Sequence, residues 1–157
     1  MMNNYSYYDK KNAYNDRSKN PQGKPLIPQK EKDELFFKEV ENNYAFVAES
    51  KMREVFRGEK PVTTNQLRNI LTLINNISLK SGFGGDTLSR EVQNDIKYLL
   101  VKIYYACGRD KSVNSFVNTT KLIELLLCVG DSRDRWLIFS KYVESLVAFH
   151  KYLGGKD

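Results

Sequence analysis

The sequence predicts an all-α protein, a compact bundle of about five helices preceded by a disordered N-terminal tail. Three observations lead to this prediction. Apolar residues recur every three or four positions through most of the chain after residue 30. No stretch alternates convincingly between apolar and polar residues, so a sheet is not expected. The first 29 residues mix Asn, Tyr, Lys, Gly and Pro without any periodicity.

The length of 157 residues corresponds to one domain. We therefore expect a basic tail over residues 1–29 and a single helical-bundle domain over residues 30–157. The net charge is +6, and residues 1–30 carry six Lys or Arg against two Asp, which leaves +2 for residues 31–157. Tyrosines and cations in the tail could stack on single-stranded nucleic acid. A solubilising tail without a specific role is the simpler interpretation.

The cellular location is expected to be cytoplasmic. No apolar run approaches the roughly 20 residues that cross a bilayer, and the polar N-terminus does not resemble a secretory signal. Two cysteines, Cys107 and Cys128, are too few for a disulfide framework or a zinc site. Each lies in an apolar helical pattern, so both are expected to be buried free thiols.

The first helix is expected from about residue 32 to residue 57, with an interruption near Asn42 and Asn43. Its second half has the stronger apolar face, and Gly58 and Pro61 indicate where it stops.

The second helix, over residues 63–80, has the clearest start in the sequence. Thr63 and Gln66 have the spacing of a capping box, and Val62 and Leu67 have that of a hydrophobic staple. Cations lie beside this start, with Arg68 inside the helix and Arg57 and Lys60 before it. A helix N-terminus flanked by cations is also a favourable place for a phosphate.

Three more helices are expected. One begins at Asp86 or Thr87 and closes at residues 107–110. The next spans residues 112–129, with a possible late start at Asn118. The last begins at residues 131–132 and has a strict seven-residue apolar repeat, typical of helix-on-helix packing, formed by Trp136, Phe139, Val143, Leu146, His150 and Leu153.

The sequence offers no active site, so an enzyme, a cofactor and a metal are not expected. His150 is the only histidine and falls on the apolar repeat of the last helix, which favours a core residue over a general base. Gly82, Gly84 and Gly85 are not followed by the Gly-Lys-Ser/Thr of a phosphate-binding loop. From the residues alone, two classes stay open: a protein that binds nucleic-acid backbones, or an adaptor between proteins.

Three segments resemble a known family, the small subunit of the type III-A CRISPR effector, the Csm complex. Residues 63–71 (TTNQLRNIL) are similar to its TTxxLRN-I/L-L segment, and residues 104–109 (YYACGR) to its Y-x-A-G-R helix ending. Residues 142–157 (YVESLVAFHKYLGGKD) are similar to its Y-x-EALVAY-x-K-x-x-GGKD terminus. Residues 1–43 carry no motif of the family.

The resemblance implies a non-catalytic, all-helical subunit that stacks in several copies. Its partners would be CRISPR RNA, target RNA, the other Csm subunits and further copies in a row, with no membrane involved. Such a subunit contacts phosphates of the guide–target duplex without reading bases. The first candidates for this contact are Lys60, Arg68 and Arg109, and the second are Lys51, Arg53, Lys102, Lys121, Arg133 and Lys151. The alternative is a helical scaffold subunit without direct RNA contact.

Overall fold

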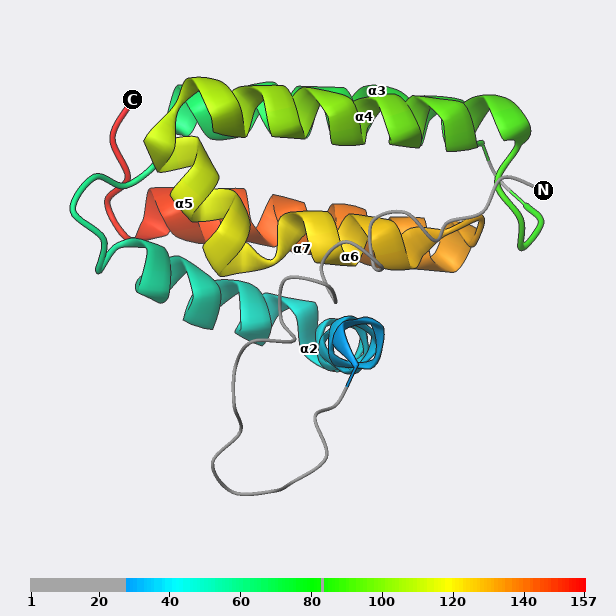
Figure 1. Ribbon diagram of the computed structural model, residues 1–157, viewed down its shortest axis with the longest axis horizontal. Helices are drawn as coiled ribbons and strands as arrows, with labels where there is room; N and C mark the ends of the chain where they lie inside the picture. The colour runs from blue at the N-terminus through cyan, green and yellow to red at the C-terminus, as the bar shows by residue number, and fades with distance from the viewer. Residues whose placement is uncertain (1–27, 83) are drawn as a thin grey trace.

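The structure, a computed structural model, describes residues 28–82 and 84–157, and these residues form six α-helices and no strand (Figure 1). The all-α prediction is therefore confirmed, and the predicted number of helices is close. All but the last two residues of the expected tail lie outside the described residues. The helices are α2 (Gln29–Val55), α3 (Thr64–Ser81), α4 (Arg90–Arg109), α5 (Lys111–Thr120), α6 (Leu122–Val129) and α7 (Arg133–Tyr152).

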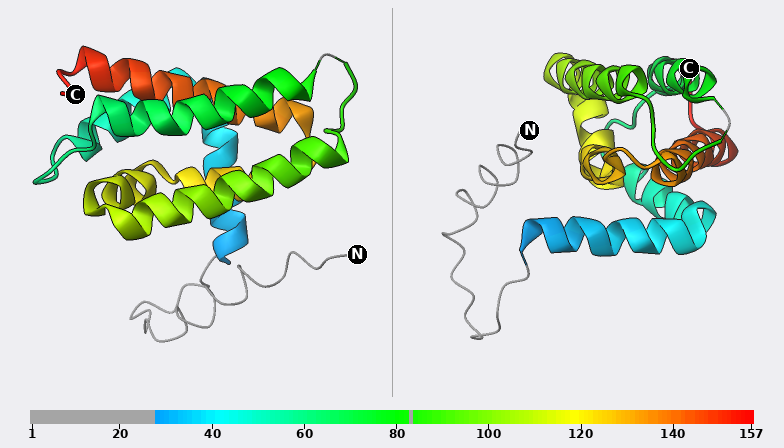
Figure 2. Two further views of the ribbon diagram at one scale, coloured as in Figure 1. Left: turned by 90° about the horizontal axis from the view of Figure 1, so that it is seen from above. Right: turned by 90° about the vertical axis from the view of Figure 1, so that its right-hand side faces the viewer.

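The helices lie in three layers. The α3–α4 hairpin forms one outer layer, α6 and α7 form the middle one, and α5 runs between these layers from the end of α4 to the start of α6 (Figures 1 and 2). Helix α2 covers the other side of the middle layer and packs against α5, α6 and α7. The turn between α3 and α4 and the turn between α6 and α7 lie at the same end of the molecule, and the C-terminus lies at the other (Figure 1).

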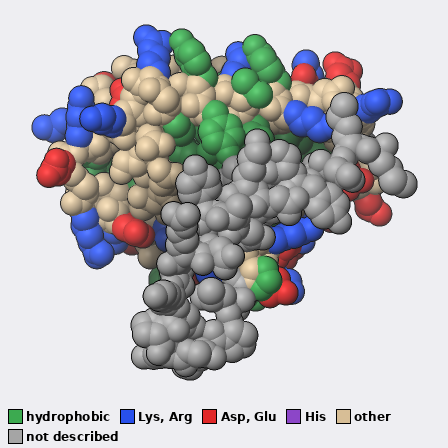
Figure 3. Space-filling view, viewed as in Figure 1, with side chains coloured by type: hydrophobic (Ala, Val, Ile, Leu, Met, Phe, Trp, Pro, Cys, Tyr) green, Lys and Arg blue, Asp and Glu red, His purple; other side chains and the backbone are tan. Residues whose placement is uncertain are grey.

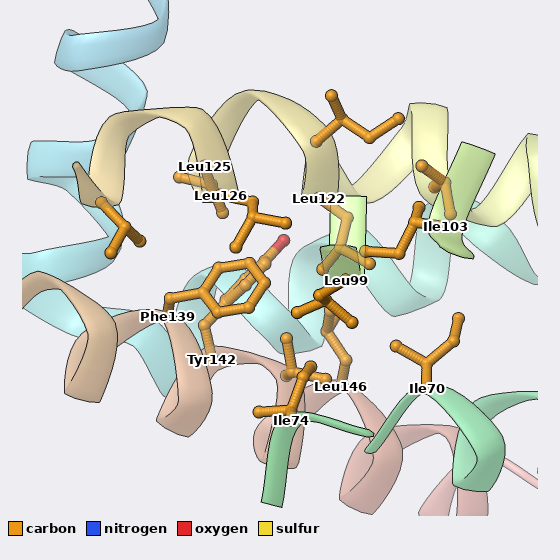
Figure 4. Close-up of a cluster of buried hydrophobic side chains, with 14 of the residues drawn as sticks. Ile70, Ile74, Leu99, Ile103, Leu122, Leu125, Leu126, Phe139, Tyr142 and Leu146 are labelled. Carbon is orange, nitrogen blue, oxygen red and sulfur yellow. The ribbon is translucent and has the colours of Figure 1, made fainter. Parts of the chain in front are cut away.

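Helix α7 carries the centre of the core. Five residues of its predicted apolar repeat are buried, including Trp136 and His150. Side chains from α3, α4 and α6 meet this helix in one cluster (Figure 4). Tyr142, which the repeat did not include, is also fully buried, and its hydroxyl donates to the carbonyl oxygen of Thr120 at 2.8 Å. Burial raises the pKa of this phenol far above its usual range.

Helix α2 bends at Asn43, where φ is −157° and ψ is 71°. The predicted interruption is therefore confirmed. The Asn43 side chain accepts from the backbone N–H of Phe46 at 3.2 Å, which starts the second half as a new helix. The first half is held to α7 by Arg135, whose guanidinium contacts the Glu34 carboxylate at 2.9 Å and lies over the Phe37 ring.

The start of α3 is the capping box that the sequence predicts. The Thr63 hydroxyl accepts from the Gln66 N–H at 3.3 Å, and the Gln66 side chain accepts from the Thr63 N–H at 2.9 Å. Val62 and Leu67, the two residues of the predicted staple, are both buried.

The predicted start of the third helix at Asp86 or Thr87 is wrong, because α4 begins later with Ser89 as its N-cap. Residues 86–88 instead pair with the α6–α7 turn. The Leu88 N–H donates to the Asp131 carbonyl at 2.8 Å, and the Arg133 N–H donates to the Asp86 carbonyl at 3.0 Å. These contacts join segments far apart in the sequence, so local cap signals did not reveal them.

The helix predicted over residues 112–129 is two helices, α5 and α6. They meet at Lys121, whose backbone is left-handed with φ 58° and ψ 35°. This conformation is uncommon outside glycine, and no Gly or Pro marks the position in the sequence.

The C-terminal segment folds back over His150 to the start of α3. The His150 ring is buried, donates from Nε2 to the Val62 carbonyl at 2.7 Å, and stacks on Phe56. Gly155 lies against this ring. Beyond it, the Lys156 carbonyl accepts from the Thr64 N–H at 2.9 Å.

We expect Gly155→Ala to lower the free energy of unfolding by about 1–3 kcal/mol, as for other overpacked sites. The reason is that a Cβ at residue 155 would overlap the imidazole of His150. Denaturant unfolding of the two proteins measures this difference.

Gly108→Ala is the matched control, since residue 108 is helical and a Cβ there meets nothing within 4 Å. This variant should be unchanged or more stable by about 0.5–1 kcal/mol. Equal stability of Gly155→Ala and the wild type would contradict the packing described here.

Candidate nucleic-acid interface

Four exposed cations gather where α3 begins, and we call this surface the basic end. Lys60 precedes the helix start and Arg68 lies in its second turn. Lys156 reaches this place because its carbonyl binds Thr64. Arg57 follows α2 and lines a shallow hollow with Phe56 and Leu153. Figure 3 shows Lys and Arg side chains at this end, on the left, mixed with a few acidic ones.

The charges of the basic end are available to a ligand. Within the described part of the chain, Arg57, Lys60, Arg68 and Lys156 make no side-chain hydrogen bond or ion pair. Sequence reasoning selected Lys60 and Arg68 as site residues but not Arg57 or Lys156. Arg57 lies in the basic stretch 51–68 and could have been included. The placement of Lys156 depends on the return of the chain over His150, which has no local signal.

The backbone at the start of α3 offers a phosphate fewer free donors than the sequence suggests. The Thr64 N–H is bonded to the Lys156 carbonyl, and the Gln66 N–H to the Thr63 hydroxyl. These donors are therefore already satisfied. The Asn65 N–H between them has no bond in the described chain, so an anion at the basic end would be held mainly by side chains.

Arg109 lies at the same end of the molecule as Arg68. The Gln66 side chain donates to the Asp110 carboxylate at 2.7 Å, so the start of α3 touches the joint between α4 and α5. Asp110 also caps α5 by accepting from Ser112. These bonds, above all that from the Ser112 hydroxyl, lower the pKa of the Asp110 carboxyl. Arg109 is exposed beside this joint.

Arg68 and Arg109 nevertheless do not share one flank of the α3–α4 layer. Residues of α3 that face α4 include Gln66 and Leu73. By helical spacing Arg68 lies on the flank of Thr64 and Leu71 instead. The structure thus brings the two arginines to one end but points them to different sides of α3.

Three of the secondary candidates already have acidic neighbours. Of these, Arg53 lines the same hollow as Arg57, whereas Lys51 lies over the Phe36 ring in the first half of α2. Exposed ion pairs of this kind contribute only about 0–1 kcal/mol, so a phosphate can displace the carboxylate. The pairs are Lys51 with Glu54 at 3.4 Å, Arg53 with Glu49 at 2.7 Å, and Lys151 with Asp157 at 4.0 Å.

Two more candidates lie elsewhere. Lys102 lines a groove between α3 and α4, with its ammonium 5.1 Å from the centre of the Tyr98 ring. Lys121 is exposed at the corner between α5 and α6.

Arg133 lies at the opposite end, where its guanidinium holds the two hairpin turns together. It donates to the carbonyl oxygens of Ser81, Gly82 and Gly85, the last two at 2.9 and 2.8 Å. We call these contacts and the backbone bonds of residues 86–88 to 131–133 the turn clasp. The guanidinium donors of Arg133 are therefore used within the fold.

The described residues show no arrangement for metal chemistry, since no three His, Cys, Asp or Glu side chains among them come together as ligands. His150 is buried and bonded to the backbone, as the sequence predicts for a core residue. Cys128 is buried and Cys107 half-buried, and burial raises the pKa of the Cys107 thiol. None of the described helices combines the length and apolar character needed to traverse a bilayer.

Comparison with known proteins agrees with the resemblance seen in the sequence. The family model described as Csm2 type III-A matches residues 40–156. The chain is 39% identical over 114 residues to the CRISPR system Cms protein Csm2 of Mycobacterium tuberculosis, covering 68% of this chain and 92% of the relative. Proteins of the same name from Enterococcus italicus and Streptococcus thermophilus are 34% and 32% identical, covering 72% and 75% of this chain and 89% and 97% of the relatives.

We expect Arg133→Ala to lower the free energy of unfolding by about 1–3 kcal/mol, because carbonyl groups of the α3–α4 turn lose their donor. Thermal and denaturant unfolding measure the effect. Arg90→Ala is the control, since Arg90 is exposed nearby and has no side-chain partner among the described residues. That variant should stay within about 0.5 kcal/mol of the wild type. An Arg133→Ala protein of normal stability would show that the guanidinium contacts of the turn clasp are unimportant.

Proposed function

The chain belongs to the Csm2 type III-A family, and we propose that it is the small subunit of a type III-A CRISPR effector, the Csm complex. In this proposal several copies lie in a row along the CRISPR RNA and its target RNA in the cytoplasm. Each copy holds the paired strands by their phosphates, without sequence specificity and without catalysis. The observation that supports RNA contact is the basic end, with its four exposed cations free of internal partners in the described chain.

Phosphate contact suits this role because the guide already supplies the specificity. Base pairing between guide and target reads the sequence, so the protein needs only to recognise the backbone. Lys and Arg side chains serve this purpose, and each neutralised phosphate releases counterions. Lys60 and Arg68 are the residues we assign to this contact first, together with Arg57 and Lys156. Arg109 would extend the contact along the other side of α3.

Repetition compensates for the small number of cations on one copy. A single chain with a few free cations binds weakly, whereas copies held side by side bind together through their effective concentration. An open row requires two different surfaces that fit each other, because a closed two-fold contact stops at a dimer. Each copy in such a row would therefore present two different surfaces to its neighbours.

A helical scaffold without direct RNA contact is the second candidate function. The observation that favours it is a stripe of exposed apolar side chains on α4. Tyr98, Val101 and Tyr105 are 61%, 59% and 70% exposed and follow each other at the spacing of a helix-packing seam. A partner helix could bury this stripe while the basic end stays in solvent.

Replacing Lys60 and Arg68 together by Ala should weaken binding to a guide–target RNA duplex to a similar degree for every sequence. The plot of log affinity against log salt concentration should become shallower by about 0.7–0.9 for each lost phosphate contact. Filter-binding titrations of the assembled complex at several salt concentrations measure both effects. Arg109→Ala should lower the slope in the same way.

Arg90→Ala is again the control, since it removes the same charge at the other end of α4 and should leave the slope unchanged. If Lys60→Ala/Arg68→Ala and Arg109→Ala assemble normally and bind RNA like the wild type, the scaffold function is the correct one.

A further inference from the structure

The outer face of α3 carries a row of uncharged polar side chains, three asparagines and one threonine. They occupy positions 65, 69, 72 and 76, a spacing of four, three and four residues that places them on one side of the helix. All four are exposed. At 1.5 Å per residue the row extends over about 16 Å. We call Asn65, Asn69, Thr72 and Asn76 the neutral face.

This composition is unusual for the solvent side of a helix. Exposed helix faces carry a mixture of charged and polar residues, whereas α3 contains no Asp or Glu and only Arg68 and Lys80 as charges. Asn and Thr are also poor helix formers compared with Ala, Lys or Glu. The residues at these four positions therefore make α3 less stable as a helix, and they form no ion pairs that would offset this cost.

The neutral face makes no polar contact within the described fold. In the described chain none of its four side chains makes a hydrogen bond. Asn43 shows the contrast, since its side chain accepts from the N–H of Phe46 and starts a helix. Each amide of the neutral face, and the Thr72 hydroxyl, thus keeps a donor and an acceptor for a ligand.

The surroundings of this face favour an anionic strand. Arg68 lies on the neighbouring flank of α3, and Asn76 lines the groove that also contains Lys102. The carboxylate of this groove, Asp95, is paired with Lys80 at 3.0 Å. The neutral face is therefore bordered by cations and continuous with the basic end.

We propose that the neutral face contacts the ribose 2′-hydroxyl groups of the RNA held at the basic end. This inference rests on the proposed function. A 2′-hydroxyl both donates and accepts, as an Asn amide or a Thr hydroxyl does, and A-form duplexes display these hydroxyls in their wide, shallow minor groove. Lys and Arg on phosphates cannot tell RNA from DNA, whereas amides and hydroxyls on ribose can. The neutral face makes this subunit selective for ribose without reading bases.

The test uses the assembled complex carrying Asn69→Ala/Thr72→Ala/Asn76→Ala. The probes are two targets of one sequence, one of RNA and one with 2′-deoxyribose throughout, each paired with the guide. The wild type should prefer the RNA target, and the triple variant should lose about ten-fold or more of this preference, because three hydrogen-bonding groups are gone. Its salt slope should not change, since no charge is removed, and its melting temperature should stay or rise because Ala is the better helix former.

Asn42→Ala is the control, because this exposed Asn belongs to α2 on the opposite side of the molecule and should not affect the preference. A triple variant with undiminished preference for RNA would overturn the inference. So would a variant that fails to join the complex or that weakens both targets equally. The proposed function is contradicted by a separate result, namely an RNA affinity and a salt slope that do not change when Lys60 and Arg68 are replaced.

Discussion

The hydrogen bond from the Thr64 N–H to the Lys156 carbonyl is the constraint on which the basic end depends. It joins the last residues of the chain to the start of α3. The buried His150 ring packs against Gly155, next to this bond, and is itself bonded to the Val62 carbonyl. This bond brings Lys156 to Arg68 and Lys60, and it also occupies a backbone donor that an anion could otherwise use. The same contact therefore helps to gather the cations and leaves most of the recognition of an anion to their side chains.

The two ends of the molecule differ in whether their cations bind backbone groups. At the turn clasp, carbonyl groups at the end of α3 and in the following turn need donors, and Arg133 supplies them. At the basic end the start of α3 presents N–H donors, which a cation cannot satisfy, so Lys60 and Arg68 are not used by the backbone. Position in the fold, rather than residue type, separates a structural cation from one that can meet a ligand.

The sequence predicted features that depend on neighbouring residues. The capping box of Thr63 and Gln66 and the break near Asn43 are local, and both are present. Ser89 is a local cap signal for α4, but the pairing of residues 86–88 with the α6–α7 turn, which excludes an earlier start, joins distant segments. No local signal marks the break at Lys121. The candidate site divides in the same way. Lys60 and Arg68 follow from their place beside a helix start, whereas Lys156 required the path of the C-terminal segment.

The α3–α4 layer is fastened at both of its ends, by the turn clasp at one and by the C-terminal segment at the other. A layer held in this way cannot slide or tilt on the helices beneath it without breaking bonds at one end. The α3–α4 layer therefore keeps a fixed length and a fixed position on the rest of the molecule. In an array of such copies, the interval between successive contacts would be set by the protein's own dimensions, and a flexible polymer lying across it would conform to that interval.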